Sequence, residues 1–294
     1  MSESILKIGL VQMTCSTDPE QNFAKAFSRV REAATDGARV VCLQELFRSR
    51  YFCQEEDVRF FELAQPIPGP STEALGELAR DLGVVIVASL FEKRAAGIYH
   101  NTAVILDTDG HIAGTYRKMH IPDDPHYYEK FYFAPGDLGF GAHQTSAGPL
   151  GVLICWDQWF PEAARLSALS GAQVIFYPTA IGWLEGQSPE TNRAQHSAWE
   201  ISQRAHAVAN GVFVVAVNRV GTEDHIRFWG QSFACDPFGQ VISRASADAE
   251  EVLVVSCDLS LVEQTRREWC FLRDRRIDAY ADLAVRFLDR PGSK

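Results

Sequence analysis

The chain has 294 residues, of which 46% are apolar and 22% are charged, and its formal net charge is −10. This composition predicts a globular protein with a large core, as one large domain or two tightly fused ones. The negative charge, with no basic run longer than two arginines, argues against nucleic-acid and anionic-membrane partners. Because no signal-peptide pattern and no run of about 18 apolar residues is present, we expect a cytoplasmic location and no membrane partner.

Apolar runs rich in β-branched residues alternate with longer amphipathic stretches along the chain. The runs predict strands at residues 6–13, 39–43, 84–90, 102–107, 150–155, 173–178, 212–218 and 252–258. Most are apolar throughout, which favours strands covered on both faces in a layered α/β sandwich. Proline or capping residues at the start and glycine at the end of most stretches predict helices at 19–35, 71–82, 161–170, 192–209 and 259–267.

The first segment with chemical potential is RVVCLQELF (39–47), where an apolar strand ends at Leu43 and Glu45 follows it. Ligands of open α/β sheets gather at the carboxyl ends of the strands, so Glu45 is a candidate general base. A solvated strand end or a helix cap is the competing interpretation, and this segment taken alone favours it.

The second segment is TYRKMHIP (115–122), which ends a predicted strand near Lys118. A lysine at a strand end is normally a surface charge, but the following loop is rich in ionisable side chains. These are His120, Asp123, Asp124, His126, Tyr127, Tyr128 and Glu129. Such groups can ligate a metal. Two prolines interrupt the run and no ligand pair has i, i+4 helical spacing, so we expect no metal site.

The most informative stretch is GPLGVLICWDQWFPEAARLSALSG (148–171), in which a strand runs into Cys155 and Pro161 opens a helix. The N–H groups of the intervening turn and the positive end of the helix favour the thiolate, which is the nucleophilic form. The other six cysteines lack this context, and none shows C-x-x-C or zinc-ligand spacing. We therefore expect seven reduced thiols, with Cys155 as the nucleophile.

Together the three segments resemble the nitrilase superfamily of carbon–nitrogen hydrolases. The matching motifs are QELF (44–47), YRKMHIP (116–122), YEKFYFAPGD (128–137), ICWDQWFPEAAR (154–165), FYPTAIG (176–182), ANGVFVVAVNRVG (209–221) and RDRRIDAY (273–280). The resemblance covers nearly the whole chain. It implies a four-layer α-β-β-α sandwich, with a hydrolase domain at 1–270 and a tail at 271–294 used in subunit contacts. It also implies a homo-oligomer, a dimer or larger, and a reaction that needs no cofactor.

The resemblance also implies the roles of the site residues. Glu45 would be the general base, Lys118 the cation that stabilises the oxyanion, and Cys155 the nucleophile. Glu129 would be a second glutamate that holds Lys118. The substrate contacts that it implies are Tyr51, Trp156, Ala180 and Glu185. Within the superfamily the chain is most similar to the branch that hydrolyses N-carbamoylputrescine to putrescine, CO₂ and ammonia.

Neighbouring branches remain as alternatives: β-ureidopropionase, aliphatic amidase or another N-carbamoyl hydrolase. A substrate carboxylate would need an arginine, and Arg48 or Arg50 could serve. An ω-ammonium would instead be held by Glu185, with a cation–π contribution from Trp156 or Trp183. We expect Arg48 and Arg50 on a loop at the rim of the pocket, where long charged side chains are more often solvated than buried. They are therefore less suited to hold a substrate carboxylate, and the sequence favours the cationic substrate. A non-catalytic protein on the same fold is disfavoured by the intact triad.

Overall fold

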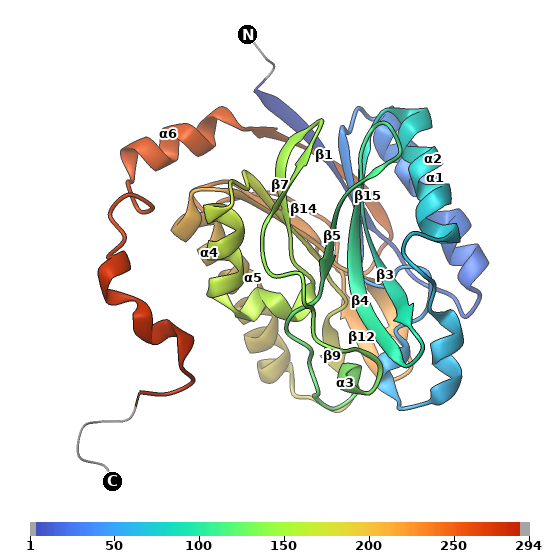
Figure 1. Ribbon diagram of the computed structural model, residues 1–294. Coiled ribbons are helices and arrows are strands. Elements are labelled where there is room, and N and C mark those ends of the chain that lie inside the picture. The colour runs from blue at the N-terminus through green and yellow to red at the C-terminus, as the bar shows by residue number, and fades with distance from the viewer. Residues whose placement is uncertain (1–3, 289–294) are drawn as a thin grey trace.

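The computed structural model describes residues 4–288, and two six-stranded sheets lie face to face between two layers of helices (Figure 1). The first sheet has the order β15 (Glu251–Asp258), β1 (Ile5–Gln12), β2 (Val40–Leu43), β3 (Val85–Ala95), β4 (Ile98–Leu106) and β5 (Ile112–Arg117). The second has the order β14 (Val241–Arg244), β13 (Phe233–Cys235), β10 (Phe213–Val217), β8 (Val174–Pro178), β7 (Gly148–Val152) and β6 (Ala142–Thr145). A third, small sheet has the order β11 (Val220–Glu223), β12 (Ile226–Trp229) and β9 (Gly182–Leu184).

Helices cover the outer face of each large sheet. Helices α1 (Pro19–Thr35) and α2 (Pro70–Leu82) pack on the first sheet, and α4 (Pro161–Leu169) and α5 (Pro189–Asn210) pack on the second. The short helix α3 (Glu129–Tyr132) lies in the long loop after β5, and α6 (Ser260–Glu268) follows β15. The predicted four-layer α-β-β-α sandwich is therefore confirmed.

Alternate residues of the first sheet enter two different cores, which explains why its strands are apolar throughout. In β1, Ile8 and Leu10 belong to the core between the sheets, whereas Val11 belongs to the core beneath α1 and α2. In β2, Cys42 faces the second sheet and Val41 faces the helices. Because successive side chains of a strand point to opposite faces, a strand covered on both sides must be apolar at every position.

The helix boundaries follow from local chemistry, as predicted. The carboxylate of Asp18 accepts a hydrogen bond from the N–H of Glu20 at 2.9 Å, and Pro19 occupies the first turn of α1. Gly83 ends α2 with φ of +64°, the left-handed conformation that glycine adopts without strain. The eight predicted strands are all present, whereas β6, β9 and β11 to β14 were not predicted. These strands have only three or four residues each, too few to show a periodic pattern.

Beyond α6 the chain leaves the sandwich and runs along one side of it through two short 3₁₀ turns (Figure 1). Residues 271–288 of this tail are described, and they are mostly exposed. Residues 289–294 of the predicted tail lie outside the described residues. In the part of the chain that the structure describes, no helix is long and apolar enough to span a membrane.

Candidate active site

Three segments from distant parts of the chain meet at the carboxyl ends of strands. Glu45 follows β2, Lys118 follows β5 and Cys155 follows β7. The first sheet is parallel from β1 through β3, and β5 runs in the same direction as β3, so the first two residues share one edge. Glu45 and Lys118 are fully buried, and Cys155 is 4% exposed. The sequence prediction that Glu45 lies at a ligand-binding sheet edge agrees with this arrangement.

The ammonium group of Lys118 lies between two buried carboxylates. Its Nζ atom donates to Glu45 Oε1 at 2.7 Å and to the two carboxylate oxygens of Glu129 at 2.9 and 2.7 Å. The hydroxyl of Tyr51 donates to Glu129 Oε1 at 2.7 Å and fixes that carboxylate. Because the three donor positions of an ammonium are all used, Lys118 has one defined orientation.

Glu45 is held at one oxygen and free at the other. Asn101 Nδ2 donates to Glu45 Oε1 at 2.8 Å, beside the bond from Lys118. Asn101 is itself fixed by the hydroxyl of Ser89, which donates to its Oδ1 at 2.9 Å. Within residues 4–288, Glu45 Oε2 is buried and has no hydrogen-bond partner. A buried, unpaired carboxylate oxygen is suited to accept a proton from a group placed beside it.

Cys155 occupies a strained backbone position at the start of a 3₁₀ turn, Cys155–Trp159. Its φ is +42°, which is rare for a residue other than glycine and is typical of side chains that are held for function. The turn is held by the buried Asp157, whose carboxylate accepts hydrogen bonds from the Ile154 N–H at 2.9 Å and the Tyr116 hydroxyl at 2.7 Å. The Cys155 thiol faces the carbonyl oxygen of Ala180 at 3.9 Å.

Burial sets the protonation states of this cluster. It raises the pKa of the Cys155 thiol well above its usual value; the Glu45 charge adds to this effect, and Lys118 opposes it. The raised pKa disagrees with the expected resting thiolate, because desolvation of the buried thiol outweighs the opposing charge of Lys118. Burial opposes the Lys118 ammonium, but the carboxylates of Glu129 and Glu45 raise the pKa of Lys118 well above its usual value. Burial also raises the pKa of Glu129 to about 7, against the opposing effect of Lys118.

A pocket of about 240 Å³ opens onto Cys155. Its walls are aromatic and aliphatic and include Trp156, Trp159, Ile181 and Trp229. Such a space suits a small linear molecule with an apolar middle section. Of the substrate contacts implied by the resemblance, Trp156 lines this pocket.

The other three implied substrate contacts have different surroundings. Ala180 is buried and contacts the Cys155 thiol through its carbonyl, and Tyr51 is buried against Glu129. Glu185 does not line the pocket: its side chain is 83% exposed and lies 3.9 Å from the ring of His225. Glu185 directly follows β9 and lies on the surface. The structure therefore does not bring Glu185 to the site.

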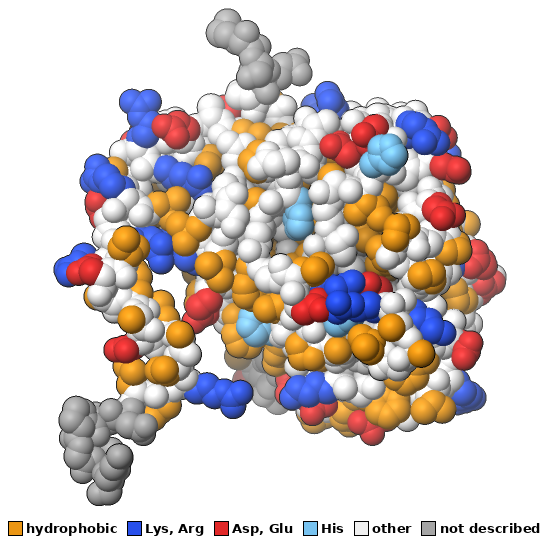
Figure 2. Space-filling model, viewed as in Figure 1, with side chains coloured by type: hydrophobic (Ala, Val, Ile, Leu, Met, Phe, Trp, Pro, Cys, Tyr) orange, Lys and Arg blue, Asp and Glu red, His pale blue; other side chains and the backbone are white. Residues whose placement is uncertain are grey.

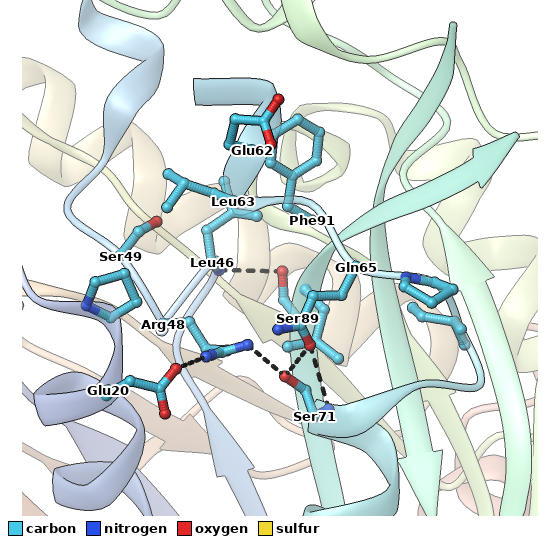
Figure 3. A pocket seen from close by; sticks show the side chains of 14 residues that line it. Glu20, Leu46, Arg48, Ser49, Glu62, Leu63, Gln65, Ser71, Ser89 and Phe91 are labelled. Carbon is cyan, nitrogen blue, oxygen red and sulfur yellow. Dashed lines mark hydrogen bonds and ion pairs between the residues drawn. The ribbon is translucent and has the colours of Figure 1, made fainter. Parts of the chain in front are cut away.

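Arg48 and Arg50, the alternative binding residues for a carboxylate, lie away from the Cys155 pocket. Figure 3 shows Arg48 in a separate pocket, bonded to the carboxylate of Glu20 and the hydroxyl of Ser71. Arg50 forms an ion pair with Asp224 at 2.9 Å. Neither guanidinium faces the nucleophile, so neither offers a charge to a substrate bound there.

A second layer of buried polar residues was not predicted from the sequence. Arg219 is fully buried, pairs with Glu223 at 2.8 Å and donates to the carbonyl oxygens of Glu45 and Leu46 at 3.0 and 3.1 Å. Glu223 in turn accepts from the Tyr51 N–H at 2.6 Å. This pair fixes the loop that carries the carboxylate base. The sequence did contain a signal for this pair. Arg219 directly follows the predicted buried strand 212–218, and a charge buried there needs a partner of opposite charge.

The ionisable side chains of the loop after β5 take up different partners. His120 Nδ1 lies 2.7 Å from Asp157, and the ring of His126 packs at a tilt against the ring of His225, with centroids 4.3 Å apart. Within residues 4–288, no group of three or more His, Cys, Asp or Glu residues is arranged to hold a metal ion.

Comparison with known proteins places the chain in a family. The carbon–nitrogen hydrolase family model matches residues 7–267. An N-carbamoylputrescine amidase from Arabidopsis thaliana is 44% identical over 285 residues, 94% of each chain. A citrullinase from Francisella tularensis subsp. tularensis is 38% identical over 96% of this chain and 99% of the relative. A crystal structure of a carbon–nitrogen hydrolase from Helicobacter pylori G27 matches with a TM-score of 0.94 and 46% identity, over 97% of this chain and 100% of that one. The chain therefore belongs to the carbon–nitrogen hydrolase family, within the nitrilase superfamily that its motifs resemble.

Proposed function

We propose that this chain hydrolyses N-carbamoylputrescine to putrescine, CO₂ and ammonia through a covalent acyl-cysteine intermediate of the thioester type. The observation that carries the proposal is the buried contact of Lys118 with Glu45 and Glu129, whose charges act on the Cys155 thiol. The relatives named N-carbamoylputrescine amidase support the choice of substrate.

In the first half of the reaction, the free oxygen of Glu45 takes the thiol proton as the sulfur of Cys155 attacks the ureido carbonyl carbon. The tetrahedral oxyanion is stabilised by the Lys118 ammonium and by the N–H of Trp156, in the first turn of the 3₁₀ segment, where N–H groups lack helical partners. The carbon–nitrogen bond then breaks, and the protonated Glu45 gives its proton to the departing nitrogen.

In the second half, Glu45 takes a proton from water, and the hydroxide attacks the acyl carbon. The carbon–sulfur bond breaks, and Glu45 returns the proton to the sulfur of Cys155. A released carbamate decomposes to CO₂ and ammonia or amine. Because the thiol is neutral at rest, transfer of its proton to Glu45 is coupled to the attack, and no resting thiolate is needed.

The proposal predicts a substrate ranking in an ammonia-release assay. We expect kcat/KM for N-carbamoylputrescine to exceed that for N-carbamoyl-β-alanine, citrulline and simple amides by at least about tenfold. The reason is that no arginine, lysine or histidine among residues 4–288 lines the pocket to pair with a substrate carboxylate. A preference for N-carbamoyl-β-alanine would instead assign the chain to the ureidopropionase side of the superfamily.

We further propose that residues 1–270 form the hydrolase domain, that the tail from Phe271 contributes to subunit contacts, and that the chain is at least a homodimer. Figure 2 shows apolar side chains along the tail, which stands apart from the sandwich. Ile277, Leu283 and Phe287 are 75%, 66% and 80% exposed. Exposed apolar side chains gathered in this way are typical of a surface that another protein covers.

Light scattering at micromolar concentration tests this assembly. We expect a mass of at least twice the 32.7 kDa of one chain. A double variant, Ile277→Asp with Leu283→Asp, should lower the mass, because each change places a charge in the proposed contact. The matched control is Val58→Asp, which changes an apolar residue that is 71% exposed but lies outside the tail. A wild-type chain that remains monomeric contradicts the proposal.

A further inference from the structure

The pocket that opens onto Cys155 has an unusual charge composition. Of the fourteen residues that line it, none is basic, and Asp124 is the one acidic residue. Deeper in the site, Lys118 is shared by two glutamates, so it leaves no excess positive charge to attract a substrate carboxylate. The pocket therefore favours a cation over an anion.

Asp124 has no cationic partner in the described part of the chain. Within residues 4–288 its carboxylate forms no salt bridge, whereas the neighbouring Asp123 lies 3.8 Å from Lys130 Nζ and does not line the pocket. The backbone around Asp124 is nevertheless fixed: its carbonyl accepts from the Tyr127 N–H at 2.8 Å, and Pro125 follows it. The carboxylate is exposed, which places it at the mouth of the pocket rather than beside the nucleophile.

We propose that Asp124 binds the ω-ammonium of the substrate and is the residue that selects ureido compounds with a cationic end. The inference rests on the proposed function and names the group that recognises the amine. The ureido carbon would lie at Cys155, the four methylene groups along Trp156 and the other apolar walls, and the ammonium at Asp124. This assigns to Asp124 the role that the sequence suggested for Glu185.

Steady-state kinetics with two substrates test the proposal. The substrates are N-carbamoylputrescine and butylurea, which has the same chain but ends in a methyl group. Asp124→Asn should raise KM for N-carbamoylputrescine about three- to fivefold and leave kcat within twofold. An exposed ion pair contributes only modestly to binding, and it is made equally in the ground state and the transition state, so its loss changes KM and not kcat. KM for butylurea should not change. Asp124→Glu, which keeps the charge, should restore most of the lost affinity.

Ionic strength supplies a second readout, because an exposed ion pair weakens as salt is added. For the wild type, KM for N-carbamoylputrescine should rise between 0.02 and 0.5 M salt, and in Asp124→Asn this rise should be lost. Asp123→Asn and Glu185→Gln are the matched controls, and each should leave KM for both substrates within twofold.

The outcomes separate this inference from the proposed function. A wild-type chain that does not hydrolyse N-carbamoylputrescine overturns both. An active wild type overturns this inference alone in three cases: KM is unchanged in Asp124→Asn, KM for butylurea rises equally, or Glu185→Gln produces the shift instead.

Discussion

Replacing Cys155 with alanine is expected to lower kcat for ammonia release by at least about 10³-fold, because no other group can form the acyl intermediate. The fold should persist. A methyl group in place of the thiol changes the buried volume little, and the sulfur gives up one long contact, 3.9 Å to the carbonyl of Ala180. Alanine at φ of +42° is about as strained as cysteine, so the substitution does not change the backbone strain and the turn should keep its conformation.

The matched control is Cys42→Ala, since Cys42 is a buried thiol on β2, the strand that leads to Glu45. It belongs to the core between the sheets and does not line the pocket. Both variants should lower the melting temperature by similar small amounts in circular dichroism, and Cys42→Ala should keep kcat within a few-fold of the wild type. Cys155→Ala that keeps more than a few per cent of wild-type kcat rules out the covalent mechanism.

The sandwich could be predicted because both faces of its main strands are buried. The stretches 40–43 and 212–217 are apolar at every position, and this pattern has few explanations other than strands between two layers. Glu45 and Lys118 follow strands of the first sheet and share one of its edges, and Cys155 follows a strand of the second sheet, which packs against the first. Their positions in the site needed no knowledge of contacts between loops.

The surroundings of the site could not be predicted, because they depend on contacts between loops that are distant in the sequence. Arg50 pairs with Asp224 and Arg48 pairs with Glu20, and no sequence pattern predicts either ion pair. Glu185 and Asp124 are both acidic residues near a motif, and only the structure shows which of them lines the pocket. The prediction of a thiolate at Cys155 failed for a related reason. The sequence of the turn does not reveal how deeply the thiol is buried, and this burial raises its pKa.

Replacing Glu129 with glutamine is expected to lower kcat by about 10²-fold or more, with the fold retained. Glutamine keeps the shape and can still accept the Tyr51 hydroxyl, but it brings an NH₂ group toward Lys118 Nζ, where a carboxylate oxygen now accepts. Lys118 then keeps one anionic partner, Glu45, and is drawn away from the position that stabilises the oxyanion.

The matched control for this change is Glu92→Gln. Glu92 is also buried, and it pairs with Arg117, the residue before Lys118, at 2.7 Å without lining the pocket. Both variants lose an anionic partner of a cation on the same chain segment, so both should lower the melting temperature. Only Glu129→Gln should lower kcat; an equal loss of kcat in both variants would make the role of Glu129 purely structural.

The pH dependence gives this prediction a signature that a structural role would not produce. The pKa of Glu129 is raised from its usual 4.5 to about 7, so between these values the folded chain holds a proton that the unfolded chain has released. The contribution of this group to stability therefore falls as the pH rises from about 4.5 to about 7, and is constant above.

Below about 7 the protonated Glu129 no longer offers Lys118 a negative charge, so kcat of the wild type should fall on the acid side. Kinetics and urea unfolding from pH 5 to 9 should show both trends in the wild type and neither in Glu129→Gln. An acid limb near pH 7 that persists in the variant would assign it to another group, because glutamine has no proton to exchange in this range.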